Sequence, residues 1–278
     1  MIEHTRAHER VPEAGAPPGV RVSLEGVLAR PAQLFIPPGL DLTRPVPLLI
    51  HFHGATHVPE HAAANALGNA LTLTVNLGAG TSVYEHAFQD PAVFDSLLVT
   101  VASAASEAEQ HDVALGNLVL SAFSAGHGAV RALLREPRHL QRISAAVLLD
   151  GIHTGYLPDG KVLAEGGALD TLLLLPWVEL GRSAMRGESA VLITHSEVFP
   201  GTFASTTETT DWLIPSLGLE RTPVLRWGPV GMQQLSETRS GSLMILGFAG
   251  NSAPDHLDHL HGLVEFLRQL KALEPPPK

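Results

Sequence analysis

The chain has 278 residues, enough for one large domain or at most two small ones. Its 28 acidic and 18 basic residues give a formal net charge of -10, which argues against nucleic acid or an anionic membrane as a main partner, because both bind basic surfaces. The chain contains no cysteine, which excludes disulfides, thiolate catalysis and cysteine-ligated zinc.

The beginning of the sequence is polar and rich in proline and glycine. No stretch approaches the ~18 apolar residues of a membrane span, and the first segment lacks the apolar centre of a signal peptide. We therefore expect a cytoplasmic protein, unless an export signal has been removed. We expect a loose lead-in over residues 1–19, one domain over 20–273 and a frayed end at EPPPK.

Short apolar runs alternate with helical patterns along the rest of the chain. Two early runs, VSLEGVLA and AQLFIPP, predict an antiparallel edge pair. Continuous apolarity in the later runs predicts strands that are covered on both faces. Six such runs follow: LLIHFH (48–53), LTLTVN (71–76), NLVLSA (117–122), AAVLL (145–149), AVLIT (190–194) and SLMILGF (242–248).

Helix signals lie between these runs. Asp90 followed by Pro91 is typical of a helix N-cap and first helical position, and the leucine-rich run over 169–180 is interpreted as a buried helix. Ser205 with Glu208 matches a capping box. One last helix is predicted from the apolar stripe Leu257, Leu260, Val264 and Leu267. The alternation predicts an α/β fold with a mostly parallel central sheet flanked by helices.

Ligands bind such sheets at the carboxyl ends of the strands. Ser124 lies at one of these ends, in the stretch AFSAGHG, between a predicted strand and a predicted helix. Ala122 and Gly126 are small enough for the sharp turn that projects a nucleophilic hydroxyl, with Ala122 in place of the first glycine of G-x-S-x-G. The amide of Ala125 and the helix behind it would favour developing negative charge.

A nucleophilic serine needs a histidine base and an acid that orients it, in the chain order serine, acid, histidine. We favour His256, which begins the last predicted helix, and keep His259 as the alternative base. Asp150 ends the fourth run, where an unpaired carboxylate would be costly; Glu197 follows the next run. We favour Asp150 and keep Glu197 open.

An oxyanion hole needs a second amide donor, and LLIHFHG ends where one could lie. Gly54 allows the backbone to turn so that its own amide or that of Ala55 faces the nucleophile. We interpret His51 and His53, on the same run, as core histidines that hold this loop.

These motifs together resemble a known superfamily. HFHG, AFSAGHG, LLDGIH and DHLDHLHGLVEFL, in this order over roughly residues 32–270, resemble the α/β-hydrolase superfamily of serine esterases. The resemblance implies that Ser124 is the nucleophile and His256 the base, that Asp150 or Glu197 orients the imidazole, and that the amides of Ala125 and Ala55 hold the oxyanion.

The resemblance also implies a small cap or insertion after the strand that ends at Asp150, here residues 151–187. Few aromatic residues and no evident charged pocket residue favour a neutral small-molecule ester as substrate. We expect no cofactor and no metal, and the oligomeric state stays open. The side chains expected near the substrate are Tyr84, His153, Tyr156, Trp177 and Phe203.

Other functions remain as alternatives. An amidase, peptidase or lactonase would use the same triad. A metal hydrolase could use His51, His53 and His57 with the acids and imidazoles of DHLDHLH. A non-catalytic binding protein with this fold is the third alternative.

Overall fold

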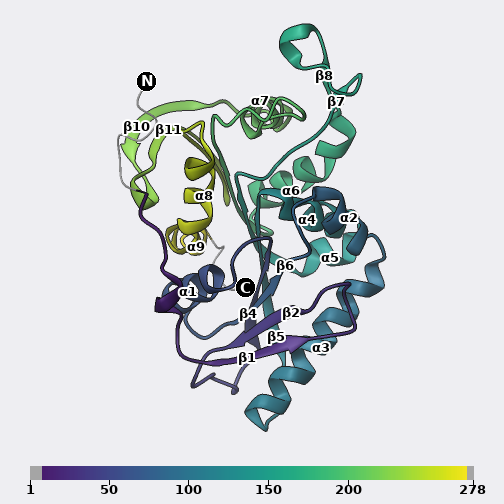
Figure 1. Ribbon diagram of the computed structural model, residues 1–278, viewed down its shortest axis with the longest axis vertical. Coiled ribbons are helices and arrows are strands. Elements are labelled where there is room, and N and C mark those ends of the chain that lie inside the picture. The colour runs from purple at the N-terminus through teal and green to yellow at the C-terminus, as the bar shows by residue number, and fades with distance from the viewer. Residues whose placement is uncertain (1–7, 274–278) are drawn as a thin grey trace.

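The main sheet has ten strands, in the order β1-β2-β4-β3-β5-β6-β9-β12-β11-β10 (Figure 1). The structure is a computed structural model and describes residues 8–273. The predictions for EPPPK, and for the first seven residues of the lead-in, therefore lie outside the described residues.

The six central strands are parallel to one another and correspond to the six predicted runs, which confirms the predicted parallel sheet. Several of them, such as β4 and β9, are buried along their whole length, as expected for strands covered on both faces. In sheet order they are β4 (Leu71–Val75), β3 (Val46–Phe52), β5 (Leu115–Phe123), β6 (Ile143–Leu149), β9 (Ala190–His195) and β12 (Leu243–Phe248).

Both edges of the sheet are antiparallel. The predicted pair β1 (Val20–Leu24) and β2 (Ala32–Ile36) is confirmed at one edge. At the other edge β10 (Thr222–Trp227) and β11 (Gln233–Ser240) extend the sheet beyond β12. We did not predict this second pair because neither strand is a long apolar run: β11 reads QQLSETRS, and β10 reads TPVLRW, with only two aliphatic residues in succession.

Helices cover both faces of the sheet, so the core has two layers. On one face α1, α8 and α9 pack on side chains such as Leu49 and Val147; on the other, α3, α4 and α6 pack on side chains such as Ile50 and Leu120 (Figure 1). The helices are α1 (His57–Ala66), α2 (Thr81–Ala87), α3 (Pro91–Glu109), α4 (His127–Leu134), α5 (Pro137–Arg142), α6 (Leu175–Met185), α7 (Thr206–Ser216), α8 (Ala253–His261) and α9 (Leu263–Lys271). Short 3-10 turns are η1 (Glu13–Gly15), η2 (Ser124–Gly126), η3 (Leu163–Glu165), η4 (Thr171–Leu174) and η5 (Pro229–Gly231).

Two predicted helix starts are confirmed. The Asp90 side chain accepts a hydrogen bond from the Ala92 amide at the start of α3. Ser205 and Glu208 form the predicted capping box of α7. Each cap satisfies backbone N–H groups that have no partner within the helix.

Two other helix predictions are wrong in part. The region predicted as one last helix forms two helices, because the helix is interrupted at Gly262 between α8 and α9. The run over 169–180 starts with the end of β8 (Ala168–Leu169) and continues through η4 before α6 begins. Leu172 and Leu175 are exposed there, so apolarity alone overstated the burial of this run.

The segment over 151–187 leaves the sheet after β6. Its small hairpin pairs β7 (Tyr156–Leu157) with β8 and projects from the body of the molecule (Figure 1). Its role as a cap, like the single domain over 20–273, stays a prediction. Over residues 8–273, no helix is both long and apolar enough to cross a bilayer.

Candidate active site

Ser124 lies at the sharp turn between β5 and α4. Its φ of 47° is in the left-handed region, which a residue other than glycine adopts at a cost. The turn is tight, since a Cβ on Gly126 would lie 2.1 Å from the carbonyl oxygen of Phe52. The Ser124 side chain is half-buried, and the Ala125 amide follows it at the start of η2, where it has no acceptor within the turn.

Asp150 follows β6 directly and is buried, with a φ of 43°. Its carboxylate accepts hydrogen bonds from the Ser196 amide at 2.9 Å, from Ser196 Oγ at 2.6 Å and from Thr206 Oγ1. Burial acts to raise the pKa of Asp150. The interaction with His259 and the hydrogen bonds from His256 and Ser196 outweigh burial and lower the pKa well below its usual value. The carboxylate is therefore ionised.

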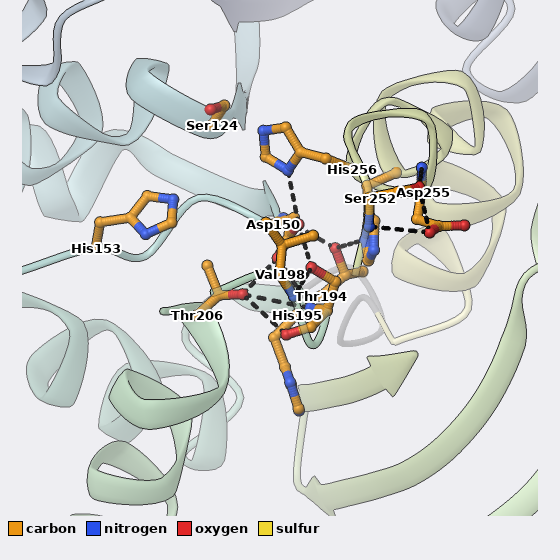
Figure 2. A network of polar contacts seen from close by, with 12 residues as sticks. Ser124, Asp150, His153, Thr194, His195, Val198, Thr206, Ser252, Asp255 and His256 are labelled. Atoms are coloured by element: carbon orange, nitrogen blue, oxygen red, sulfur yellow. Dashed lines mark hydrogen bonds and ion pairs between the residues drawn. The ribbon is translucent and has the colours of Figure 1, made fainter. Parts of the chain in front are cut away.

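His256 lies in the first turns of α8, above Asp150. Its Nδ1 lies 2.7 Å from Asp150 Oδ2, and its ring packs on Phe123 with the ring centroids 4.6 Å apart. Because Nδ1 donates to the carboxylate, Nε2 of the neutral ring is an acceptor. Figure 2 shows this second nitrogen turned to the side on which Ser124 lies. The two side chains make no hydrogen bond within residues 8–273, and such pairs often close only when substrate binds.

The two alternative triad residues lie elsewhere. Glu197 is exposed, and the carboxylate that contacts His256 among the described residues is that of Asp150. His259 is buried in the core, with Nδ1 2.7 Å from Thr194 Oγ1 and its ring against Phe248. The geometry therefore brings together the favoured residues rather than the alternatives.

The loop after β3 lies beside the Ser124 turn. His53 and Gly54 have φ values of 71° and 139°, so the chain reverses there before the exposed Ala55. His51 Nε2 lies 2.9 Å from the His53 carbonyl oxygen, and Ser121 Oγ lies 3.0 Å from His51 Nδ1. His51 therefore holds the loop, as the sequence predicted, and ties it to the strand that carries Ser124.

Three of the residues expected near the substrate are buried in the core instead. Tyr84 is inaccessible, and its hydroxyl bonds with His53 Nδ1 at 2.9 Å and with the loop after β4. Tyr156 is 2% exposed and donates to Glu208, and Trp177 is 1% exposed. These three predictions are wrong because a large aromatic ring on a helix or a short strand packs into the core as readily as it faces a ligand.

The other two, His153 and Phe203, line a cavity, with ring centroids 4.9 Å apart. In the view of Figure 2, His153 and Ser124 both lie to the left of His256. Charged residues line this cavity too, namely Glu85 and Arg131, contrary to the expectation that the pocket has none.

Sequence reasoning missed the residues that support the site. Ser196 and Thr206 bind Asp150, and His127, to which we assigned no role, has Nδ1 2.8 Å from the Ser124 carbonyl oxygen. Of these residues, only Ser196 could have been recognised from the sequence as a possible site residue, since it directly follows the end of a strand. Thr206 comes from α7, which the sequence gives no reason to place beside β6.

The histidines considered for a metal site take part in hydrogen bonds within the protein instead. Both ring nitrogens of His51 take part in hydrogen bonds, and His57 Nε2 lies 3.2 Å from the Val11 carbonyl oxygen. Among the described residues, one group of three acidic and imidazole side chains brings its possible ligand atoms within 4.8 Å of one another, namely His8, Asp255 and Asp258. The His51-His53-His57 set therefore does not fit a metal site.

Buried neutral histidines predict loss of stability in mild acid. Burial lowers the pKa of His51 to about 3, and burial together with the charge of Arg221 lowers that of His195 to about 3. In the unfolded chain both titrate near pH ~6.5. Between these values only the unfolded chain binds the protons, so stability falls as pH falls, by on the order of 1 kcal/mol per histidine at pH ~5.5.

Urea unfolding at pH ~7.5 and ~5.5 measures this loss. We expect His195→Gln to reduce the difference between the two pH values, whereas His111→Gln, at an exposed histidine, leaves it unchanged. Equal stability of the wild-type chain at both pH values would contradict the prediction.

Comparison with known proteins supports the architecture. No protein-family profile matches the chain, and no curated protein sequence matches it. Among solved structures, a hyperthermophilic esterase from the archaeon Pyrobaculum calidifontis is similar with a TM-score of 0.50 and 12% identity, over 93% of this chain and 85% of that one. The chain has the α/β-hydrolase fold.

Two further solved structures are similar to this chain at low sequence identity. An uncharacterised protein from Capnocytophaga ochracea DSM 7271 is similar with a TM-score of 0.52 and 11% identity, over 93% of this chain and 65% of that one. A thermostable esterase is similar with a TM-score of 0.44 and 14% identity, over 87% of this chain and 56% of its own length. At such identities the likeness concerns the fold alone.

Proposed function

We propose that the chain is a serine hydrolase that cleaves carboxylic esters through an acyl-enzyme intermediate. The observation that carries the proposal is the contact between His256 and Asp150 at 2.7 Å, with the free side of the imidazole turned toward Ser124 (Figure 2). These three residues come from three separate strand ends or helix starts, and their arrangement supports the proposal.

In the first step Ser124 Oγ attacks the ester carbonyl carbon. The hydroxyl proton moves to His256 Nε2, and the ionised Asp150 stabilises the imidazolium that forms. The amide of Ala125, with that of Gly54 or Ala55, donates to the oxyanion. The tetrahedral intermediate collapses when His256 returns the proton to the alcohol, which leaves with the electrons of the broken C–O bond.

Water then repeats the sequence on the acyl-enzyme. His256 Nε2 takes a proton from water, the hydroxide attacks the acyl carbon, and Ser124 Oγ leaves with the proton that His256 gives back. Asp150 keeps the imidazole in the required tautomer throughout, because its Oδ2 accepts from Nδ1.

The test is hydrolysis of p-nitrophenyl acetate by the purified chain. We expect a burst of p-nitrophenol close to one equivalent, because an ester with a good leaving group acylates faster than it deacylates. Activity should withstand a chelator, whereas a metal hydrolase would lose it. Absence of both turnover and burst would overturn the proposal.

A further inference from the structure

The proposed mechanism leaves one fully buried carboxylate unused, that of Asp258. It lies on α8, two residues after His256. Side chains two positions apart on a helix are separated by about 200° around its axis, so these two leave opposite sides of α8. His256 contacts Asp150 on one side, and Asp258 lies on the other. A buried carboxylate on the helix of the proposed base needs partners of its own.

Two side chains from the start of the described chain face this carboxylate. His8 Nδ1 donates to Asp258 Oδ2 at 2.7 Å, and Arg10 Nη2 lies 3.7 Å from Asp258 Oδ1. Both donors are partly buried by the contact. A segment that lies 250 residues away in sequence therefore compensates the buried carboxylate of α8.

The same segment also contacts both ends of α8. Arg10 Nη2 donates to the carbonyl oxygen of Pro254, in the first turn, at 3.1 Å. The Val11 amide donates to Nδ1 of His261, the last residue of the helix, at 3.0 Å. Residues 8–11, which we call the strap, therefore contact α8 at its beginning, its middle and its end.

The strap is bonded to α1 as well. His57, the first residue of α1, donates from Nε2 to the Val11 carbonyl oxygen at 3.2 Å. His57 follows closely after Gly54, whose amide is one candidate donor for the oxyanion. Gly54 itself lies against α8, since a Cβ at this position would be 3.1 Å from Leu260 Cδ2. The helix of the base and the proposed oxyanion loop therefore meet directly, and the strap bonds to α8 and to the helix that follows the loop.

The position of α8 decides whether the proposed base can act. His256 has to keep its 2.7 Å contact with Asp150 while Nε2 is turned toward Ser124 (Figure 2). A displacement of about 1 Å in a reacting group can cost about 10²-fold in rate. The helix has only nine residues, and the interruption at Gly262 means that α9 does not hold it as a continuous helix would. Contacts from outside the helix are therefore needed to fix it.

We propose that the strap positions the base of the hydrolase, with His8 and Arg10 holding α8 through the buried carboxylate of Asp258. The strap fixes α8 against the oxyanion loop, so that His256 keeps its place between Asp150 and the nucleophile in both steps of the reaction. His8, Arg10 and Asp258 are positioning residues, because they act through His256 and lie away from the reacting atoms. This inference rests on the proposed function, since it concerns the base of the same site.

The test removes both strap side chains in the full chain. In His8→Leu/Arg10→Met the carboxylate of Asp258 loses these two donors, and we expect kcat for p-nitrophenyl acetate, per active site, to fall about tenfold or more. KM should stay near the wild-type value, because His256 serves both acylation and deacylation and the two steps slow together. The amplitude of the p-nitrophenol burst counts the active sites, so unfolded protein does not enter this kcat.

The matched control is His111→Leu/Arg182→Met, which makes the same two changes at exposed residues outside α8 and the strap. It should keep the wild-type kcat. Adding Asp258→Asn to the strap variant tests the path through Asp258, because an uncharged amide of the same shape needs the two donors far less than a carboxylate does. We expect this triple variant to recover kcat to within about threefold of the wild-type value.

Hydrogen exchange reports the position of α8 without any ester. We expect the amides of α8 to exchange faster in the strap variant than in the wild type, and to slow again when Asp258→Asn is added. The amides of α6, which packs on the other face of the sheet, should exchange at the wild-type rate in both variants.

The outcomes separate the two proposals. If the wild-type chain hydrolyses the acetate and the strap variant keeps its kcat per active site, the strap proposal is wrong and the hydrolase stands. A smaller burst with unchanged kcat per active site would show that the strap only stabilises the fold, which also overturns the proposal. So would a loss of kcat that Asp258→Asn does not restore. If the wild-type chain hydrolyses no ester, both proposals fall.

Discussion

Replacement of Ser124 by alanine is expected to reduce hydrolysis of p-nitrophenyl acetate by about 10⁴-fold or more, since loss of a triad nucleophile removes the covalent path altogether. The variant should also lose its reaction with a fluorophosphonate, which bonds covalently to an activated serine oxygen. Both effects follow from a single atom, because Ser124→Ala removes only Oγ.

The fold should survive this change. Ser124 Oγ makes no hydrogen bond within the described residues, and alanine meets the same backbone strain at φ 47°. We therefore expect a melting temperature within a few degrees of the wild-type value. Ser96→Ala, at an exposed serine of α3, serves as the matched control for activity and labelling. Full labelling of the Ser124→Ala variant would place the nucleophile elsewhere.

The fold was predictable from the sequence where one residue pattern decides one element. Buried parallel strands must be apolar along their length, so all six could be found without knowledge of their neighbours. β10 and β11 could not, because these two strands carry side chains such as those of Arg226 and Glu237, which are typical of loops as well. Their place in the sheet follows from tertiary packing against β12.

The positions of the residues proposed for the triad were predictable for a different reason. The topology of a parallel sheet brings strand ends together, so Ser124 and Asp150 could be placed near each other from chain order alone. The sequence favoured Asp150 and left Glu197 open; in the structure Asp150 is buried against His256, whereas Glu197 is exposed. The contacts of Thr206 with Asp150 and of His127 with Ser124 could not be predicted, since each depends on a turn or on helix packing that no local sequence pattern specifies.

The lining of the cavity was the least predictable part. The sequence around a single aromatic residue does not tell whether its ring faces a cavity or the core, and the helix residues Tyr84 and Trp177 lie in the core. The pair of Glu85 and Arg131 is separated by 46 residues, and only the packing of α2 on α4 brings the two side chains together.

Replacement of Asp150 by asparagine is expected to reduce kcat for p-nitrophenyl acetate by about 10³- to 10⁴-fold, although the side chain keeps its shape. The amide can present its NH2 group to His256 Nδ1, which then turns into the acceptor and leaves Nε2 protonated. In that tautomer His256 cannot take the proton from Ser124. The change also removes the negative charge that stabilises the imidazolium in the transition state.

The matched control is Glu197→Gln, the same carboxylate-to-amide change at the exposed acid that follows the next strand. Because Glu197 does not contact His256, we expect its kcat to stay near the wild-type value. Asp150 is also a centre of hydrogen bonds with Ser196 and Thr206, so thermal unfolding of Asp150→Asn must be measured alongside activity. A folded Asp150→Asn variant with activity within tenfold of the wild type, or an equal loss in Glu197→Gln, would show that Asp150 does not orient the base.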